Sequence, residues 1–381
     1  MIDTPLIEDR HRELAEKVDR FNREQIRKAP HGESEDERAR NFVGLLAREG
    51  LLAYAVPADF NTGAKTLDAR AVCVIREHLS YESSLADLMF AMQGLGSFPI
   101  TLAATEEVKR KFLPLVKSGE AIAAFAITEP DAGSDVGAIQ TTARRDGAGY
   151  VIDGVKTFIS NAGLAHFYTV FAKTDADRGN KGISAFVVES DAPGFSVEEK
   201  IELIAPHPIG RIRFDGCRVA AENLLGEEGS GFKIAMATLD SFRPSVGAAA
   251  AGLAWRAMDE AISYSKRRQQ FGRPIAEFQA TQMKLAEMAT ELDAARLLVY
   301  RAAWKKDAGA ERVTLEAAMA KLYATEAAQR IIDAAVQIHG GVGVTRGSAV
   351  EHLYRDVRAL RIYEGTSEIQ KLVIASQLLK S

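Results

Sequence analysis

Cysteine is almost absent from this sequence. Its 381 residues include only Cys73 and Cys217, which lie far apart and outside any CxxC pattern. That distribution argues against a disulfide framework and fits a reducing compartment. The N-terminal residues show no apolar signal core, and no uncharged run approaches a membrane-spanning length. We therefore expect no membrane span and a cytoplasmic protein, or a mitochondrial-matrix protein only if the sequence is a mature eukaryotic form.

The sequence also lacks an excess of basic residues. It has 48 Lys and Arg against 52 Asp and Glu, a formal net charge of -4. Extended binding to nucleic acid, which needs many cations to neutralise phosphates, is therefore a poor expectation. Hydrophobic residues make up 47% and charged residues 26%, which is typical of a soluble globular protein. The length predicts two or three packed units, and we find no internal repeat.

The first third of the chain has the apolar periodicity of helices. The spacing of apolar residues predicts helices over residues 7–26, 36–49, 66–82, 85–93 and 106–117. The segment GLGSFPI at 94–100 contains two glycines and a proline, so it is predicted to be a loop or a helix junction.

The middle of the chain changes to short runs rich in Val, Ile, Phe and Thr, separated by Gly, Asp and Asn. These runs predict strands over residues 150–160, 167–174, 182–190, 195–203 and 210–219. The strands do not alternate with helices, which disfavours a parallel doubly wound sheet. After Gly231 long helical segments return at 232–267, 280–303 and 314–339, with further helix after Gly347.

The predicted fold class is therefore α+β. It comprises an N-terminal helical domain (1–122), a central β-barrel or sandwich domain (123–232) and a C-terminal helical bundle (233–381). The Met and Leu stripes of the helices are interpreted as core.

Four segments concentrate groups suited to chemistry, although each also has an ordinary structural explanation. They are FAITEPDAGSDVGA (125–138), RRQQFGRPIAEFQ (267–279), QIHGGVGV (337–344) and RIYEGTSEIQK (361–371). The first is an ordinary capped turn or a set of donors for a flat polar ligand. The second is an interhelical loop or a phosphate clamp with a stacking ring. The glycines of the third follow a helix rather than a strand, so they fail as a dinucleotide-binding turn.

Taken in this order, the four segments closely resemble the acyl-CoA dehydrogenase family of FAD flavoproteins, over almost the whole chain. KTFISNAG (156–163) and RDVRALRIYEGTSEIQ (355–370) add to the resemblance. The resemblance implies FAD between the β domain and a four-helix bundle, in a homotetramer that is a dimer of dimers. No metal site is expected.

The resemblance also assigns residues to the cofactor. Phe158 stands where many members carry tryptophan, and Ser160 where many carry threonine; both positions pack against the flavin ring. The positions implied to lie beside FAD are Phe125, Ile127, Thr128, Gly133, Ser134, Phe158, Ser160, Thr366 and Glu368. Those implied to hold the FAD of a neighbouring subunit are Arg268, Gln270, Phe271, Gln279, Gln337 and Gly341.

Glu364 matches the family's catalytic base in Y-E-G-T. A thioester α-C–H is a weak acid, so its base must be positioned and desolvated. The resemblance implies that Glu364 takes the α-proton while the β-hydride passes to flavin N5, giving a trans-2-enoyl-CoA. Some members place the base before the arginine of an L-D-x-x-R segment, where this sequence has Phe242 before Arg243. The positions implied to contact substrate are Ser134, Asp240, Arg243 and Gly365.

An acyl-CoA substrate and reoxidation by an electron-transfer flavoprotein are the partners implied. The alternatives are a dehydrogenase of carrier-protein-bound acyl groups, an acyl-CoA oxidase, a nitroalkane-oxidising relative, and a flavin-binding or helical scaffold without turnover. Glutamate at position 364 argues against the last two. The stretch 204–214 departs from the glycine-rich family pattern. Acyl length is undefined, and we expect a short, branched or cyclic acyl group because no extension is present to enclose a long tail.

Overall fold

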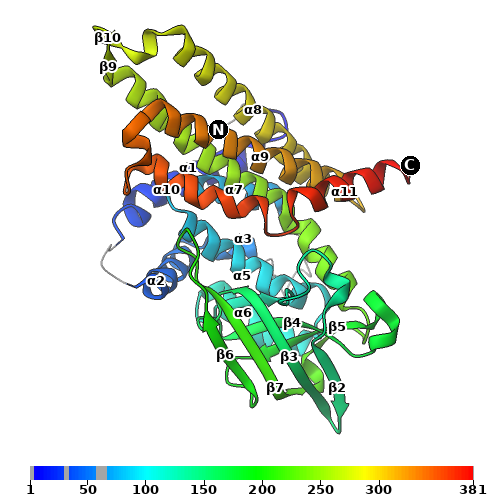
Figure 1. Cartoon of the computed structure of the whole chain (residues 1–381). Coiled ribbons are helices and arrows are strands. Elements are labelled where there is room, and N and C mark those ends of the chain that lie inside the picture. The colour runs from blue at the N-terminus through cyan, green and yellow to red at the C-terminus, as the bar shows by residue number, and fades with distance from the viewer. Residues whose placement is uncertain (1–3, 30–33, 57–66, 381) are drawn as a thin grey trace. The chain divides into compact units, whose positions relative to one another are not determined.

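The computed structural model describes residues 4–29, 34–56 and 67–380, and the chain folds into two compact units (Figure 1). Unit 1 contains residues 1–28, 68–87 and 240–381, and unit 2 contains residues 29–67 and 88–239. Thr66, the first residue of one predicted helix, lies outside the described residues. The order of helices, then strands, then helices is confirmed.

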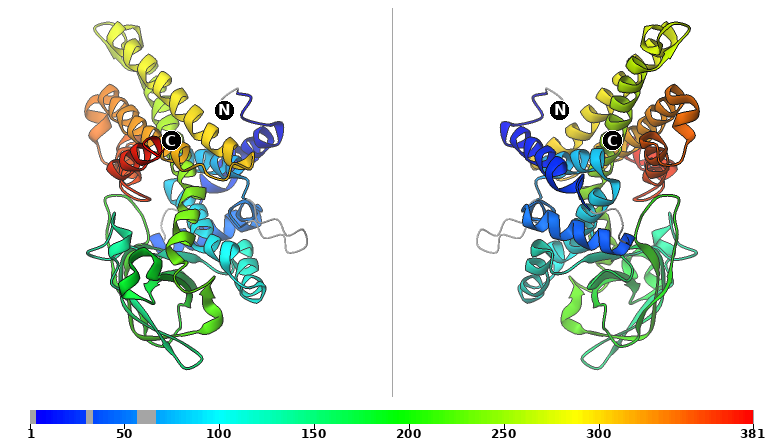
Figure 2. Two further views of the ribbon diagram at one scale, coloured as in Figure 1. Left: turned by 90° about the vertical axis from the view of Figure 1, so that its right-hand side faces the viewer. Right: turned by 90° about the vertical axis from the view of Figure 1, so that its left-hand side faces the viewer.

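Unit 1 is helical. Its helices are α1 (Asp9–Phe21), α4 (Ala69–Glu82), the start of α5 (Ser84–Ala103) up to residue 87, α7 (Gly231–Arg267) from residue 240 onward, α8 (Gln279–Asp307), α9 (Thr314–His339), α10 (Ala349–Arg358) and α11 (Ser367–Leu378). It also contains the strands β9 (Gln269–Gln270) and β10 (Arg273–Pro274), a π-helical turn (Asn22–Ile26) and 3-10 turns at Ile275–Glu277, Gly340–Val344 and Ala359–Arg361. The strands β9 and β10 form a small hairpin between α7 and α8, at one end of the bundle (Figure 2).

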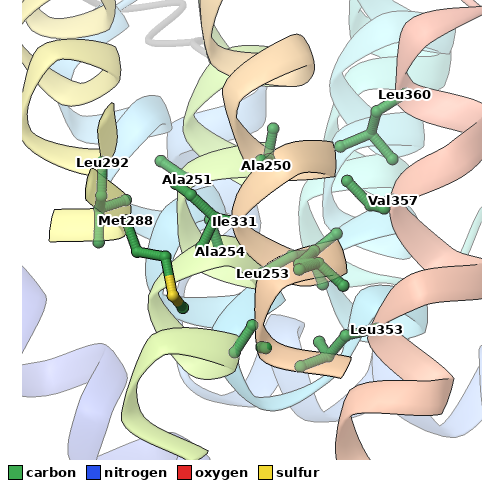
Figure 3. Packing of buried hydrophobic residues seen from close by; sticks show 14 of the residues in the cluster. Ala250, Ala251, Leu253, Ala254, Met288, Leu292, Ile331, Leu353, Val357 and Leu360 are labelled. Atoms are coloured by element: carbon green, nitrogen blue, oxygen red, sulfur yellow. The ribbon is translucent and has the colours of Figure 1, made fainter. Parts of the chain in front are cut away.

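The core of unit 1 lies where α7, α8, α9 and α10 meet, as Figure 3 shows. The α7 side is lined by Ala250, Ala251 and Ala254, whose small side chains let the helices approach closely. Leu292 and Ile331 pack against them from α8 and α9. Full burial of each large aliphatic side chain contributes about 1.5–3 kcal/mol to folding, so this cluster stabilises the packing of the bundle helices.

Buried ion pairs attach α4 to the bundle within unit 1. The Glu77 carboxylate, 3% exposed, accepts hydrogen bonds from Arg296 Nε at 2.5 Å and Tyr300 Oη at 2.6 Å. Asp307 accepts from Arg70 Nε at 2.7 Å. Charges this deep need such partners, and the pairs fix the position of α4, which also carries Arg76.

Unit 2 combines helices with the sheet. Its helices are α2 (Glu35–Arg48), α3 (Leu52–Ala55), α5 (Ser84–Ala103) from residue 88 onward, α6 (Glu106–Ser118) and the part of α7 before residue 240. Its strands are β1 (Ala123–Ala126), β2 (Thr142–Asp146), β3 (Gly149–Ser160), β4 (Phe167–Lys173), β5 (Ile183–Glu189), β6 (Phe195–Lys200), β7 (Ile209–Ala220) and β8 (Leu224–Leu225). Short 3-10 turns cover Val136–Ala138, Ala176–Gly182 and Ala221–Asn223.

These strands pair into one eight-stranded sheet, in the order β6-β7-β3-β2-β4-β5-β8, with β1 beside β4. Pairing is antiparallel except for β1 with β4 and the single β2–β4 contact. The long β3 carries register shifts against β7 between Ile152 and Gly154 and between Lys156 and Ile159. Such irregularities re-aim side chains, and the second one immediately surrounds Phe158.

The prediction of a loop at 94–100 is wrong, because α5 continues as a helix through Ala103. Tertiary packing here outweighs the helix-breaking tendency of the glycines and the proline. A Cβ on Gly96 would lie 2.7 Å from the Ala124 nitrogen, so the glycine permits close contact with β1 rather than a turn. The Gly96 carbonyl accepts from Thr169 Oγ1 at 2.7 Å, and Ser97 Oγ donates to the Gln93 carbonyl at 2.6 Å.

Helix α5 is the one element in the described ranges with the length and apolar composition of a membrane span. Its best window is, however, 89% buried within the protein. That burial is the pattern of a core helix, and it makes α5 weak evidence for a membrane segment.

Candidate functional site

The expected base, Glu364, lies in unit 1 between the 3-10 turn Ala359–Arg361 and helix α11. Its backbone φ is 52°, a left-handed value that non-glycine residues rarely adopt, and Gly365 follows at 90°. Strain of this kind costs about 1–3 kcal/mol and persists only where the surroundings impose it. The chain therefore turns sharply at the base and then enters α11, where Thr366 Oγ1 caps the Ile369 N–H.

Three side chains hold the two carbonyl groups of this turn. Gln370 Nε2 donates to the Glu364 carbonyl at 3.2 Å and to the Gly365 carbonyl at 3.0 Å. Arg243 Nε approaches the Glu364 carbonyl at 3.4 Å, and Lys321 Nζ donates to the Gly365 carbonyl at 2.7 Å. These donors, from α7, α9 and α11, are the surroundings that impose the left-handed turn.

The Glu364 carboxylate itself is left incompletely bonded. Its Oε2 atom is shielded from solvent and has no hydrogen-bond partner among the described residues. Burial raises the pKa of this carboxyl, and the repulsion from Asp87 adds to the rise, while the positive charges of Arg76, Arg243 and Lys321 oppose it. A buried oxygen without a partner is costly, and Gln370 Oε1, on the neighbouring helix α11, is in the same condition.

A buried ion pair lies on one side of the base. Arg76 on α4 binds Asp87 through Nε at 2.8 Å and Nη2 at 2.9 Å, and its Nη1 donates to Ser245 Oγ at 2.9 Å. Burial raises the pKa of the neighbouring Tyr363 hydroxyl, and the charge of Arg76 opposes that rise. Burial raises the pKa of Asp87, while the charge of Arg76 opposes that rise.

The predicted substrate residues Asp240 and Arg243 form an ion pair with each other on α7. Arg243 Nη1 lies 2.6 Å from Asp240 Oδ1, and Asp240 Oδ2 accepts from Thr314 Oγ1 at 2.8 Å. This i,i+3 pair differs from an ordinary surface pair because Arg243 is only 6% exposed and also reaches the base turn. Phe242, at the alternative base position, is 1% exposed.

The positions expected to hold a neighbouring subunit's FAD lie on the surface of unit 1. Arg268 directly precedes β9, and Gln270 and Phe271 belong to the β9–β10 hairpin, where Phe271 is 93% exposed and has a φ of 54°. Its ring contacts the Phe278 ring edge to face, with 6.2 Å between the ring centroids. An aromatic ring held outward on a strained turn is available to contact another molecule.

The other expected cofactor positions in unit 1 are also accessible. Gln279 begins α8, Gln337 lies in the last turn of α9, and Gly341 follows that helix; all three are exposed. Nothing lies within 4 Å of where a Gly341 Cβ would stand. Glu368 is exposed in the first turn of α11.

Unit 2 places the rest of the expected cofactor residues around the end of β1 and the loop that follows. Phe125 and Ile127 are buried, Thr128 is half-buried, and Gly133 and Ser134 are exposed. The Phe125 ring packs against the Phe171 ring, with 4.9 Å between the ring centroids. The loop therefore turns from the core to the surface, and its exposed end presents polar groups.

A fully satisfied buried carboxylate anchors this loop. Glu129, 5% exposed, accepts from Lys156 Nζ at 2.8 Å and from the backbone N–H groups of Gln140 and Thr141. Burial would raise the pKa of Glu129, but the charge of Lys156 and these hydrogen bonds lower it overall. Lys156 Nζ also donates to the Ile127 carbonyl at 3.0 Å.

The end of β3 carries the two residues expected against the flavin ring. Phe158 is 56% exposed and has a φ of 53°, so its ring faces outward from a strained strand position. Ser160 Oγ lies 2.7 Å from His207 Nε2. Burial lowers the pKa of His207 to about 4, so its imidazole is neutral. The atypical stretch 204–214 thus supplies a hydrogen-bond partner for Ser160.

Sequence reasoning missed several of these residues. Arg76, Asp87, Lys321 and His207 belong to no motif, and a lone charged or histidine residue in a helical pattern carries little signal. For Lys321 a signal did exist, because it lies at the buried positions of α9 among Ala317, Ala320 and Ala324. A lysine on an apolar helix face needs a partner.

The exposed aromatic and polar groups fit FAD. In unit 2 the strained Phe158 offers a ring face, Ser160 a hydroxyl, and Thr128 and Ser134 further polar groups. In unit 1, Arg268 and Gln270 offer hydrogen-bond donors suited to a phosphate. Flat rings and phosphates are the chemistry of a flavin dinucleotide.

Comparison with known proteins identifies the fold. Models of the acyl-CoA dehydrogenase N-terminal, middle and C-terminal domains match residues 8–120, 124–217 and 229–379. A 3-(aryl)acrylate reductase of Clostridium sporogenes is 45% identical over 345 residues, covering 90% of each chain.

Two solved structures extend this likeness. One is a chain from the structure of the electron transferring flavoprotein of Acidaminococcus fermentans, at a TM-score of 0.92 and 35% identity with full coverage of both chains. The other is an acyl-CoA dehydrogenase complexed with FAD from Bacillus anthracis, at a TM-score of 0.90 and 32% identity, covering 100% of this chain and 68% of that one. This protein therefore belongs to the acyl-CoA dehydrogenase family and is an FAD-dependent oxidoreductase.

Proposed function

We propose that this enzyme oxidises an acyl-CoA thioester to the trans-2-enoyl-CoA and that Glu364 removes the α-proton. The observation that carries the proposal is the Glu364 carboxylate, which has a shielded Oε2 without a partner on a backbone held in a left-handed turn. A positioned, desolvated carboxylate with a raised pKa is suited to abstracting a weakly acidic proton.

The α-C–H bond breaks with transfer of its proton to Glu364, and the β-hydride leaves as the double bond forms. Bound FAD supplies the acceptor for that hydride. Among the described residues, no backbone carbonyl accepts from the Glu364 N–H. This N–H is a donor for the thioester carbonyl, where negative charge develops as the proton leaves.

We propose that the acyl group is cyclic or aryl-substituted rather than a long straight chain. Support comes from the 45% identical relative, which is named a 3-(aryl)acrylate reductase. That name also describes the reverse direction, reduction of the double bond. The same Glu364 serves both directions, because a base that accepts the α-proton in one direction donates it in the other.

Electron transfer to an electron-transfer flavoprotein remains our proposal for the acceptor. It is supported by the solved structure of such a flavoprotein that contains a chain resembling this one. Rapid peroxide formation without any mediator would favour an oxidase instead. Activity on carrier-bound acyl groups alone would favour the carrier-protein alternative.

We also propose that the chain assembles as a homotetramer that completes each FAD site. Several large apolar side chains of unit 1 are exposed: Phe271, Met283, Val344, Leu372 and Leu379. Exposed apolar groups in this number are typical of an interface. Light scattering should give four times the chain mass, and Phe271→Asp should lower both the mass and the FAD content.

The proposed reaction is tested by anaerobic titration of the FAD-loaded enzyme with 3-phenylpropionyl-, cyclohexanecarbonyl-, butyryl-, palmitoyl- and glutaryl-CoA. We expect the first two to bleach the flavin absorbance most efficiently and Glu364→Gln to abolish the bleaching. The photoreduced enzyme is then mixed with cinnamoyl-CoA, and return of the absorbance would show the reductive direction. Absence of bleaching by every CoA thioester would contradict the proposal.

A further inference from the structure

Lys321 is a buried cation next to the base turn for which no motif accounts. It projects from α9, it is 0% exposed, and its Nζ donates to the Gly365 carbonyl at 2.7 Å. Burying a lysine ammonium costs free energy unless hydrogen bonds or an opposite charge offset the loss of hydration. Burial lowers the pKa of Lys321 to about 8, whereas the nearby charge of Glu364 raises it.

The contact bears directly on the geometry of the base. Glu364 and Gly365 occupy consecutive left-handed conformations, which turn the Gly365 carbonyl to face Lys321. Gln370 and Arg243 contact the same turn, but Gln370 Nε2 is divided between two carbonyls and Arg243 Nε is 3.4 Å away. The bond from the ammonium is the shortest of the four and is charge-assisted, which makes it the strongest.

The charges around Glu364 differ in how far they are already neutralised. Arg76 on α4 binds Asp87 on α5 through two hydrogen bonds, and Arg243 on α7 binds Asp240. Lys321 on α9 contacts a neutral carbonyl, and Glu364 exerts the largest charge effect on it. The neighbouring Tyr363 is un-ionised because burial raises its pKa. The charges of Arg76 and Arg243 lower the pKa of Glu364 more than that of Lys321 does, and Glu326 and Glu368 also act on the ammonium. Among the described residues, Lys321 differs from the two arginines in that it has no carboxylate bonded to it and holds the base turn directly.

We propose that Lys321 is a positioning residue for the base, holding the Glu364–Gly365 turn through the Gly365 carbonyl and favouring the ionised carboxylate through its charge. The inference rests on the proposed role of Glu364. The ammonium does not touch the reacting atoms. It acts through the backbone of the base and through its electrostatic field.

The test compares Lys321→Met, Lys321→Gln and Lys321→Arg in the FAD-loaded enzyme. The rate of anaerobic flavin reduction by 3-phenylpropionyl-CoA is measured from pH 5 to 9 by stopped flow, together with KM and flavin content. Methionine removes both donor and charge, glutamine keeps a donor without charge, and arginine keeps both in a different shape. Lys284→Met, on an exposed face of α8, is the matched control.

Loss of the charge should raise the pKa of Glu364, so the acid limb of the rate profile should move to higher pH by about 1 unit or more in the Met and Gln variants. The maximal rate should fall further in Lys321→Met than in Lys321→Gln, with KM nearly unchanged. Arginine should return the limb towards its wild-type position. Should Lys321→Met fail to accumulate, the Gln and Arg variants carry the comparison.

An acid limb that stays at the wild-type pH in Lys321→Met and Lys321→Gln would overturn the proposal. So would an equal shift in Lys284→Met. The failure of the underlying function is recognised separately, because it would appear as normal flavin reduction in Glu364→Gln. A dead Glu364→Gln combined with an unmoved limb in the Lys321 variants contradicts only the role of Lys321.

Discussion

Among the described residues, each unit contains a lysine that is 0% exposed, Lys156 in unit 2 and Lys321 in unit 1, and the glutamates near them are bonded differently. In unit 2, Lys156 binds Glu129 directly at 2.8 Å, and backbone N–H groups satisfy the rest of the carboxylate. In unit 1, Lys321 binds a backbone carbonyl instead, and Glu364 Oε2 has no partner among the described residues.

The pKa values follow this difference. Burial is the largest influence on both carboxyls, and it raises the pKa of Glu364. At Glu129 the charge of Lys156 and the hydrogen bonds outweigh burial, so the pKa of Glu129 is lowered. The pKa of each lysine is lowered to about 8 by its burial. The same two residue types thus form a fully bonded pair in unit 2 and leave an unsatisfied oxygen in unit 1, which suits the role of base that we propose for Glu364.

The largest expected effect separates the two glutamates by stability. Glu129→Leu leaves Lys156 buried without its partner and should lower the free energy of unfolding by about 3–5 kcal/mol. Glu364→Leu removes an unsatisfied oxygen and should change stability by less than about 1 kcal/mol. Urea unfolding followed by circular dichroism measures both. Equal destabilisation by the two variants would show that Glu129 and Glu364 do not differ in their contribution to stability.

A second comparison concerns the glycines beside each site. Gly365 has a φ of 90°, and an added Cβ would lie 2.5 Å from Gln370 Nε2. Gly365→Ala should therefore destabilise the turn by about 1–3 kcal/mol and slow flavin reduction. Gly133 has nothing within 4 Å of the Cβ position, so Gly133→Ala should leave the unfolding midpoint unchanged. A stable, fully active Gly365→Ala would show that the turn is not constrained.

The charges near the base allow a prediction of opposite sign to that for Lys321. Asp87→Asn removes a negative charge that raises the pKa of Glu364. The acid limb of flavin reduction should then move to lower pH, by about 1 unit. Ser245→Ala also removes a hydrogen bond to Arg76 but no charge, so its limb should stay in place. A shift to higher pH in Asp87→Asn would contradict the electrostatic account.

The smallest expected effect lies in unit 2, at the partner of Ser160. His207→Leu removes one hydrogen bond to that hydroxyl and should raise the Kd of the apoprotein for FAD about two- to tenfold. His207→Gln retains a hydrogen-bonding group and should bind FAD nearly as the wild type does. Fluorescence titration of apoprotein with FAD gives both values. Equal affinities of wild type and His207→Leu would place Ser160 away from the cofactor.

The sequence predicted the order of the elements well, because apolar periodicity persists over long helices and the strands are rich in β-branched residues. It failed at 94–100, where Gly96 and Pro99 indicate a break but packing against β1 keeps the helix. That contact joins residues distant in sequence, so no local pattern encodes it.

The candidate site was predictable where residues follow one another in a motif, as with Glu364 and Gly365. Of its supporting residues, Gln370 lies in the same motif at 355–370, whereas Arg76 and Lys321 come from two other helices and meet the base turn only in the folded unit. The contact of His207 with Ser160 is likewise set by the pairing of β3 with β7, which brings together segments 47 residues apart. Roles for the cofactor positions stay predictions until FAD binding is measured.

The central claim is that Glu364 is a base kept incompletely bonded for catalysis. Its most direct test is stopped-flow flavin reduction by 3-phenylpropionyl-CoA from pH 5 to 9 in wild type and Glu364→Gln. We expect one acid limb in the wild type, above the ordinary glutamate pKa of about 4.3, and a rate at least about a hundredfold lower in the variant without that limb. A variant that reduces its flavin at nearly the wild-type rate, with the limb unchanged, would contradict the account.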